Sequence, residues 1–434
     1  MEHMPAPDFS RLNTRVDSLR GELVRVLSDL VRTPTVQIPP RGSEKKGQEL
    51  LSAEFRKLGY ETDLYDIGEV KALHTHPLRH DKHHIADRWN LAVKIKGKGG
   101  GHSLVLNGHM DTVPPSEFPW TRDPFKPVVE QGRLYGLGSY DMKASLAAML
   151  ILAKVLKEEG LSLRGDLTLE SVCDEEDGGV HGTIAQRLRG YQADAALVLE
   201  PSALVINNMH KGGYFPEMRV AEAAAGINLN REFIPQLPKM LAVVLKEIEE
   251  LAKLRTATAK IPPEYRHQQE PVPVWVSKIV SGLWGKSVPI AIANQVQLLV
   301  YLQSVPGESM ERIREQFLEW NAGLSKKYPD LFPKPPAIEA TVRLMEPSFI
   351  PADHPVVTTL AASVEAQLGA RPKIQGSPAP CDMFVFNNHF NTPCAWFGPD
   401  GSNAHAPDEY VELESVVNCV KCLLRFVGDW CVWA

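Results

Sequence analysis

The sequence predicts an α/β fold that is interrupted by a smaller α+β domain, and three observations support this prediction. Expected strands and helices alternate from about residue 91 to residue 204, which is typical of a layered sheet covered by helices. A middle region, from about 214 to 344, contains two strand–helix–strand units. The α/β pattern returns after Pro351. A chain of 434 residues is consistent with two or three domains of about 150 residues.

The first part of the chain is expected to begin with a helix and then to alternate. Apolar residues recur at every third or fourth position over 9–30, which predicts a helix. Four strands are expected after it, at 91–97, 103–109, 167–176 and 195–201. Two helices are expected between them, at 145–159, which stops at Gly160, and at 182–188.

The middle and last parts carry the remaining expected elements. In the middle region the expected strands are 214–220, 290–303 and 337–344, and the expected helices are 238–254 and 309–324. Proline is tolerated in the first turn of a helix, so Pro238 is compatible with this assignment. Residues 256–275 are rich in Pro and Gln and are expected to be irregular. The last part is expected to form a helix at 355–368, a strand at 392–397 and a helix at 414–427.

Composition excludes several classes of protein. The 47 Lys and Arg against 53 Asp and Glu give a net charge of -6, so no basic surplus indicates nucleic-acid binding. No run approaches the roughly 18–20 apolar residues of a membrane helix, and the N-terminus lacks the pattern of a secretory signal. Six cysteines are too few for a disulfide scaffold. We expect a soluble, cytoplasmic protein that binds neither nucleic acid nor membranes.

Histidines and carboxylates follow the expected strands. His109 with Asp111, the group 174–176, Glu200 and His405 each come just after a strand, and Asp141 follows the turn GLGSYD. Ligands of α/β sheets collect beyond the carboxyl ends of the strands, so these residues are expected to share one crevice. Each of them taken alone is more often a surface or capping residue. It is their joint placement that indicates a site.

The donor types in this crevice suit divalent metals. Imidazoles and carboxylates together favour zinc, with cobalt or manganese as alternatives. Five ligands that include one shared carboxylate would hold two ions about 3.5–4 Å apart. Asp111 is placed to fix the ring of His109. Glu175 and Glu176 are neighbours and point to opposite sides of an extended chain, so one can bind metal while the other acts as a general base.

Five motifs resemble those of the metal-dependent deacylases and exopeptidases that include acetylornithine deacetylase, succinyl-diaminopimelate desuccinylase, aminoacylase and glutamate carboxypeptidase. The motifs are LVLNGHMDTVP (104–114), YGLGSYDMKASLAAML (135–150), SVCDEEDGGVHGT (171–183), LVLEPS (197–202) and FGPDGSNAHAPDEYV (397–411). Their order and spacing also match the family. The resemblance covers nearly the whole chain.

The resemblance implies a zinc-exopeptidase-like catalytic domain with a central mixed sheet, formed by 1–205 and 346–434. The insertion, 206–345, would be a lid that also pairs two subunits into a homodimer. The implied metal ligands are His109, Asp141, Glu176, Glu200 and His405. Asp141 would bridge two ions, Glu175 would be the general base and Asp111 would orient His109. Arg343, Gly376 and Ser377 correspond to positions near the substrate. The implied activity is hydrolysis of the amide bond of an N-acyl amino acid or a short peptide.

One departure from the family affects catalysis. Family members carry a lid histidine that stabilises the oxyanion in the partner subunit, whereas Ala224 stands about where it would be. Loss of one oxyanion donor typically costs about 10²–10³ in rate. His210 and His267 are the candidates to replace it. A metal-containing binding protein with impaired catalysis is therefore an alternative. A dipeptidase or carboxypeptidase of the same family is a second alternative, since the sequence does not resolve the substrate pocket.

A histidine-rich run does not belong to these motifs. LHTHPLRHDKHH (73–84) is expected to be a solvated loop, with adventitious metal binding as the alternative. Cys419 and Cys422 are expected to pack in a helix, since a second paired motif of a zinc site is missing.

Overall fold

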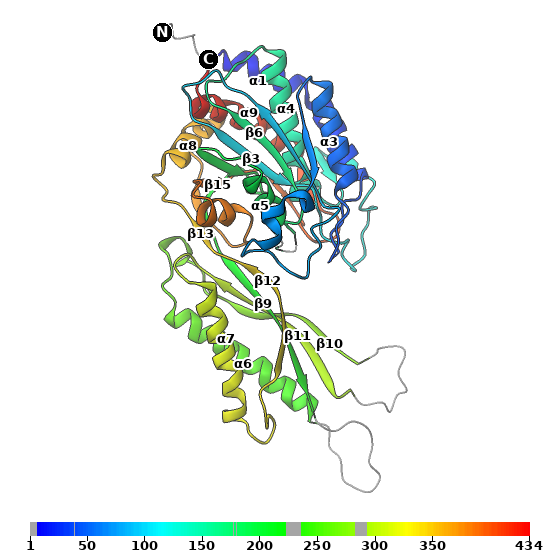
Figure 1. Ribbon diagram of the computed structural model, residues 1–434, viewed down its shortest axis with the longest axis vertical. Helices are drawn as coiled ribbons and strands as arrows, with labels where there is room; N and C mark the ends of the chain where they lie inside the picture. Colours follow the sequence, from blue (N-terminus) through cyan, green and yellow to red (C-terminus); the bar gives the residue numbers. More distant parts are fainter. Residues whose placement is uncertain (1–6, 39, 177, 179, 223–235, 283–292) are drawn as a thin grey trace. The chain divides into compact units, whose positions relative to one another are not determined.

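A computed structural model describes residues 7–38, 40–176, 178, 180–222, 236–282 and 293–434, apart from the side chains of Val342 and Arg343. The chain forms two compact units (Figure 1). The first unit comprises Met1–Met209, Phe349–Gln375 and Cys381–Ala434, and the second comprises His210–Ser348 and Gly376–Pro380. The second unit thus begins four residues after the expected boundary at 206 and includes a short segment that the sequence did not assign to it. Ala224 lies outside the described residues.

A nine-stranded sheet runs through the first unit. Its order is β1-β2-β6-β3-β7-β15-β8-β13, and β14 pairs with β8. β3 runs parallel to β6 and β7, and β7 runs parallel to β15, whereas β2 is antiparallel to β1 and β6, and β8 is antiparallel to β15. The expected mixed sheet is therefore confirmed. Its strands are β1 (Asp63–Asp66), β2 (Trp89–Ile95), β3 (Leu104–His109), β6 (Leu167–Val172), β7 (Ala195–Val198), β8 (Ile206–His210), β13 (Ser348–Phe349), β14 (Ile374–Ser377) and β15 (Cys394–Trp396).

Both faces of this sheet are buried. Leu104 and Leu106 of β3 belong to one apolar core, whereas Val105 between them belongs to another on the opposite face. Such continuous apolar strands are typical of parallel sheets covered on both sides. Helices α1, α4 and α9 pack against one another over the first core (Figure 1). The helices of this unit are α1 (Phe9–Ser18), α2 (Arg20–Arg32), α3 (Lys45–Lys57), α4 (Ala144–Glu158), α5 (His181–Leu188), α8 (Pro355–Leu368) and α9 (Leu413–Cys431). All six cysteines are buried, unpaired thiols within the first unit.

A small antiparallel sheet joins two distant parts of the first unit. Its order is β16-β17-β5-β4, formed by Gly401–Ser402, Tyr410–Glu412, Arg133–Tyr135 and Val128–Glu130. Tyr135 pairs with Tyr410 in its register. The loop that leads to Asp141 therefore lies beside the segment that follows His405.

The second unit is an antiparallel sheet with two helices. The sheet order is β10-β11-β9-β12, and α6 and α7 share a core with one face of it (Figure 1). In β9, Tyr214, Met218 and Val220 enter this core. The elements are β9 (Gly212–Ala221), α6 (Leu237–Thr258), β10 (Val274–Ser281), β11 (Gln295–Ser304), α7 (Met310–Lys327) and β12 (Ala337–Met345).

Two expected elements differ from the structure. The helix expected over 9–30 is two helices, because Leu19 breaks from helical geometry between α1 and α2. The strand expected over 167–176 ends at Val172, because Asp174 has a φ of 64°, which no strand accommodates. In the part of the chain that the structure describes, no helix combines the length and apolar character needed to cross a membrane.

Candidate metal centre

The centre forms where three parallel strands of the first unit end together. In the register of the sheet, His109 of β3 stands beside Val172 of β6, and Asn107 of β3 stands beside Val198 of β7. The chain segments that leave these strands therefore emerge at one edge, as expected for carboxyl ends of parallel strands. The polar residues at or just after these ends are His109, Asp111, Asp174, Glu175, Glu176 and Glu200.

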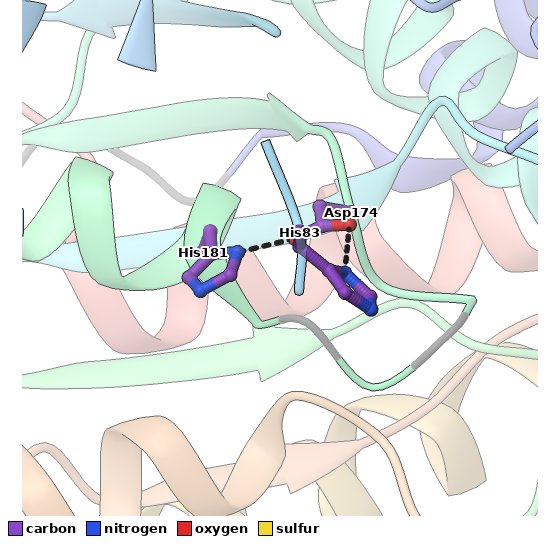
Figure 2. A group of neighbouring side chains, drawn as sticks. All are labelled: His83, Asp174 and His181. Atoms are coloured by element: carbon purple, nitrogen blue, oxygen red, sulfur yellow. Dashed lines mark hydrogen bonds and ion pairs between the residues drawn. The ribbon is translucent and has the colours of Figure 1, made fainter. Parts of the chain in front are cut away.

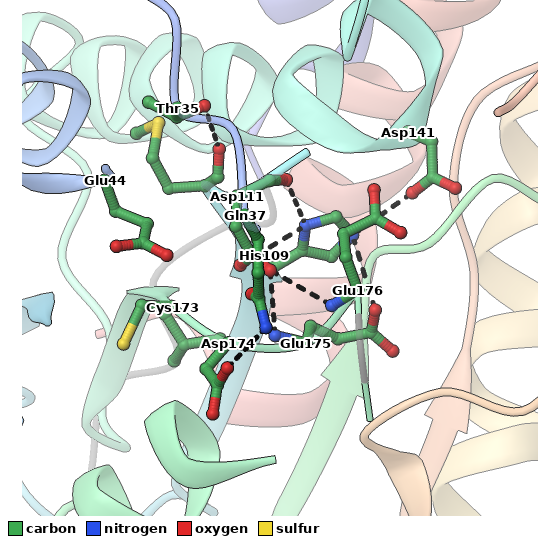
Figure 3. A network of polar contacts seen from close by, with 12 residues as sticks. Thr35, Gln37, Glu44, His109, Asp111, Asp141, Cys173, Asp174, Glu175 and Glu176 are labelled. Carbon is green, nitrogen blue, oxygen red and sulfur yellow. Dashed lines mark hydrogen bonds and ion pairs between the residues drawn. The ribbon is translucent and has the colours of Figure 1, made fainter. Parts of the chain in front are cut away.

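The imidazole of His109 lies at the middle of the centre. Its Nε2 is 3.1 Å from Asp141 Oδ1, 3.5 Å from Glu200 Oε1 and 3.9 Å from Glu175 Oε2. The ring is buried, and Figure 3 shows it close to Asp111, Asp141 and Glu175. One imidazole nitrogen thus faces three carboxylates from three different chain segments.

His405 closes the other side of the centre. Its Nε2 is 2.8 Å from Glu176 Oε2 and 3.3 Å from Asp141 Oδ2. Asp141 therefore offers one carboxylate oxygen to each histidine. The side chain of His405 is 48% exposed, whereas that of His109 is 1% exposed. The centre is open on the side of His405.

Glu409 fixes the loop that carries Asp141. Its buried carboxylate accepts the main-chain N–H groups of Gly138, Tyr140 and Asp141, at 2.9, 2.9 and 3.0 Å. Glu409 lies four residues after His405, so one short segment places both Asp141 and His405. The sequence analysis missed this residue, although it lies within the last motif.

Asp111 has two separate contacts. His109 Nδ1 lies 2.9 Å from the main-chain oxygen of Asp111 and 3.8 Å from its carboxylate. The carboxylate oxygen Oδ2 instead accepts the main-chain N–H groups of Glu175 and Glu176, each at 3.0 Å. The ring of His109 is therefore oriented by a carbonyl, and the carboxylate holds the turn that carries the two glutamates.

The pKa values reflect crowding of negative charge. Burial raises the pKa of Glu200 to about 8. Burial alone would lower the pKa of His109, but Glu200 and Asp141 raise it well above its usual value. The charge of Glu176 is the main cause that raises the pKa of His405 to about 12. The carboxylates of the centre thus strongly favour positive charge close to them. The two imidazoles supply only part of that charge.

The donor set fits divalent metal ions. Ligand atoms lie within 4.8 Å of one another in two groups, one of His109, Asp141 and Glu176 and one of His109, Glu175 and Glu200. Glu200 Oε1 is buried and faces His109 Nε2 at 3.5 Å, which is too long for a good hydrogen bond, so this oxygen can still accept a metal ion. Carboxylate and imidazole donors in this number suit zinc, cobalt or manganese.

The residues expected near the substrate lie in the second unit. His210 is fully buried, and its Nδ1 contacts the carbonyl oxygen of Lys211 at 2.8 Å, whereas His267 is exposed. Ser377 is buried, and its carbonyl oxygen accepts the hydroxyl of Tyr265 at 2.8 Å. A Cβ on Gly376 would lie 2.4 Å from that tyrosine ring, so packing requires a glycine there. Arg343 pairs through its backbone with Phe215, and its side chain lies outside the described part.

The histidine-rich run is not simply a solvated loop. His84 is exposed, but His83 is 3% exposed and its Nδ1 lies 3.1 Å from Asp174 Oδ1. The spacing of the run gave no signal for this, because its neighbours at 81, 82 and 84 are all exposed. His181, in the third motif, contacts the same carboxylate (Figure 2).

Comparison with known proteins agrees with the five motifs. The family described as peptidase family M20/M25/M40 matches residues 105–429. N-formyl-4-amino-5-aminomethyl-2-methylpyrimidine deformylase of Bacillus subtilis (strain 168) is 26% identical over 446 residues, covering 97% of both chains.

Solved structures share the fold. The dipeptidase Dug1p of Saccharomyces cerevisiae has a TM-score of 0.78 with 14% identity, over 98% of both chains. The YXEP protein of Bacillus subtilis, described as a dinuclear metal-binding peptidase of the M20 family, has a TM-score of 0.61 with 14% identity, over 94% of this chain and 98% of its own.

Proposed function

The chain belongs to peptidase family M20/M25/M40 and is a hydrolase that acts on amide bonds, and from this premise we propose a dinuclear metal-dependent amidohydrolase. Its substrate would be an N-acyl amino acid or a short peptide. The observation that carries the proposal is the convergence of four carboxylates on two imidazoles at one sheet edge. An anionic centre of this kind needs cations to balance it.

We assign the ligands from the contacts of the two histidines. His109, Asp141 and Glu200 would hold one ion, and Asp141, Glu176 and His405 would hold the other. Asp141 would hold both ions, because its two oxygens face the two histidines separately. Zinc is the first candidate, with cobalt and manganese as alternatives. When bound, the ions polarise the scissile carbonyl and lower the pKa of water.

Glu175 is the proposed general base. Its carboxylate is nearly buried within the centre, and its main chain is fixed by Asp111. A carboxylate in this position takes a proton from the attacking water and returns it to the leaving amine. Buried surroundings favour such transfer, because the proton stays within the site and is not lost to solvent.

Two classes of substrate are candidates for this chain. The deformylase relative acts on an N-formyl group and the structural neighbour Dug1p is a dipeptidase, so both deacylation and dipeptide cleavage are candidates for this chain. We place N-acyl substrates first, because the deformylase is 26% identical to this chain and the dipeptidase Dug1p is 14% identical. By family resemblance we also propose a homodimer formed through the second unit.

Metal-loaded protein should be assayed with N-formyl, N-acetyl and N-succinyl amino acids and with dipeptides. We expect turnover with one of these classes, and a loss of about 10²–10⁴ in kcat for Glu175→Gln, with two metal ions per chain retained. Protein that holds no divalent metal, or a Glu175→Gln variant as fast as the parent, would overturn the proposal. The same assay tests whether the enzyme works with alanine at 224.

A further inference from the structure

A second polar cluster is centred on Asp174, the residue that directly precedes Glu175 and Glu176 of the metal centre. The carboxylate of Asp174 is fully buried and receives donors from four other residues of the first unit. Its oxygens lie 3.0 Å from Arg88 Nη1, 2.6 Å from Gln37 Nε2, 3.1 Å from His83 Nδ1 and 2.5 Å from His181 Nδ1. We call these five residues the Asp174 cluster. Figure 2 shows the two imidazoles directed at the carboxylate from the histidine-rich run and from α5.

Two histidines and a carboxylate resemble a metal site, but the hydrogen bonds here contradict that interpretation. His181 Nε2 accepts the main-chain N–H of His80 at 2.9 Å, so its Nδ1 must carry the proton that it donates to Asp174. Nδ1 of His181 then carries a proton, and the lone pair of Nε2 is already used to accept the His80 N–H, so neither nitrogen is available to a cation. Arg88 also places a fixed positive charge on the same carboxylate, and it is held there by Glu44.

The cluster is joined through the backbone to the proposed general base. Asp174, Glu175 and Glu176 are consecutive, and Asp174 has a left-handed φ of 64° that an aspartate adopts at a cost. Its side chain is fixed by the cluster, while the N–H groups of the next two residues are fixed by Asp111. Figure 3 shows the glutamate side chains leaving this turn on the side opposite to Asp174.

We propose that the Asp174 cluster positions the Glu175–Glu176 turn, with Asp174 as a positioning residue for the general base. The inference rests on the proposed function, because it needs Glu175 to be that base. Four donors from three chain segments hold Asp174 in a conformation that sets the direction in which Glu175 leaves the turn. Displacement of a reacting group by about 1 Å can cost about 10² in rate.

The test uses the full chain loaded with zinc and three variants at two positions. In Asp174→Asn, we expect kcat to fall by about 10–100-fold with KM changed little. In His181→Ala, we expect kcat to fall by about tenfold, and in His181→Asn to return close to the parent, because the asparagine Nδ2 can replace the Nδ1 donor. His84→Ala is the matched control, since His84 is exposed in the same histidine-rich run. It should behave like the parent.

A second measurement separates this inference from the proposed function. Hydrogen exchange of the Glu175 and Glu176 amides should become about tenfold faster in His181→Ala, and stay at the parent rate in His84→Ala. Faster exchange in a protein that proves to hydrolyse no amide would support the positioning of the turn and reject only the proposed function. Unchanged exchange and unchanged kcat in Asp174→Asn and His181→Ala would overturn the inference. The inference would also be overturned if the parent bound a third metal ion per chain and His181→Ala did not bind it.

Discussion

The carboxylate oxygen Oδ2 of Asp111 lies 3.0 Å from the main-chain nitrogen of Glu175. The same residue meets His109 Nδ1 through its carbonyl oxygen at 2.9 Å. Asp111 therefore connects a proposed metal ligand to the turn of the proposed general base, and it uses a different oxygen for each. The negative charge of the Asp111 carboxylate can therefore be tested separately from its role as a hydrogen-bond acceptor.

Asp111→Asn should retain activity within about tenfold of the parent, because its side-chain oxygen can still accept both N–H groups of the turn. Asp111→Ala should lose about 10² in kcat, because those two buried N–H groups then lack their acceptor. Steady-state kinetics on zinc-loaded protein measure both effects. If the asparagine variant loses as much as the alanine variant, the negative charge and not the acceptor is what matters.

Glu409→Gln should weaken metal binding by about 10–100-fold, because an amide presents N–H groups where the loop of Asp141 needs acceptors. At saturating zinc, kcat should stay close to that of the parent. Metal titration followed by activity measures the change. Glu412→Gln, whose parent side chain pairs with Arg133 near the surface, is the control and should bind zinc normally. Equal affinities for all three proteins would reject the assigned role of Glu409.

Metal binding near neutral pH should release about three protons per chain, one from each imidazole and one from Glu200, whose pKa of about 8 leaves it largely protonated before metal binds. The raised pKa values of His109 and His405 mean that both imidazoles are protonated before metal binds, and a ligating imidazole must be neutral. Apparent affinity should therefore rise with pH. Calorimetric titration in two buffers with different ionisation heats counts the protons. Binding without proton release at pH 7 would contradict the prediction.

Acid should weaken the fold partly through His210. Burial lowers the pKa of His210 to about 4, below its ordinary value of about 6.5. Between these values the unfolded chain binds a proton that the folded chain does not, so stability falls as pH decreases from 6.5 to 4, by about 3 kcal/mol at most. The free energy of unfolding of His210→Gln should depend less on pH in this window. Parallel pH profiles for the variant and the parent would exclude the effect.

The mixed sheet could be predicted because its strands are apolar and bounded by turn residues, as in 103–109 and 195–201. The break at Leu19 could not, because its spacing continues the helical pattern across it. Helix α3 was missed because only a few of its residues, including Leu51 and Phe55, carry an apolar signal. Local periodicity therefore gave the core elements, and the exceptions depend on contacts made elsewhere in the fold.

The candidate centre was accessible from sequence to a similar extent. The convergence of His109 and Glu200 follows from their places after strands, whereas Asp141 was placed with them by the motif that carries it after the turn GLGSYD. The Asp174 cluster does not, because His83 reaches Asp174 from 91 residues away and its own neighbourhood in sequence is polar. Glu409 has no periodic signal either, and its role depends on three N–H groups more than 260 residues earlier. Supporting contacts of this kind are long-range, so a single sequence does not reveal them.

Because every cysteine is buried, the rate at which a thiol reagent modifies the protein reports on opening of the first unit. Burial raises the pKa of Cys422 and of Cys431 to about 12, so neither is a reactive thiolate at neutral pH while the unit is closed. The second unit contains no cysteine at all. A thiol-labelling reagent therefore reports only on exposure of the first unit, and added zinc should slow the labelling if metal binding keeps that unit closed.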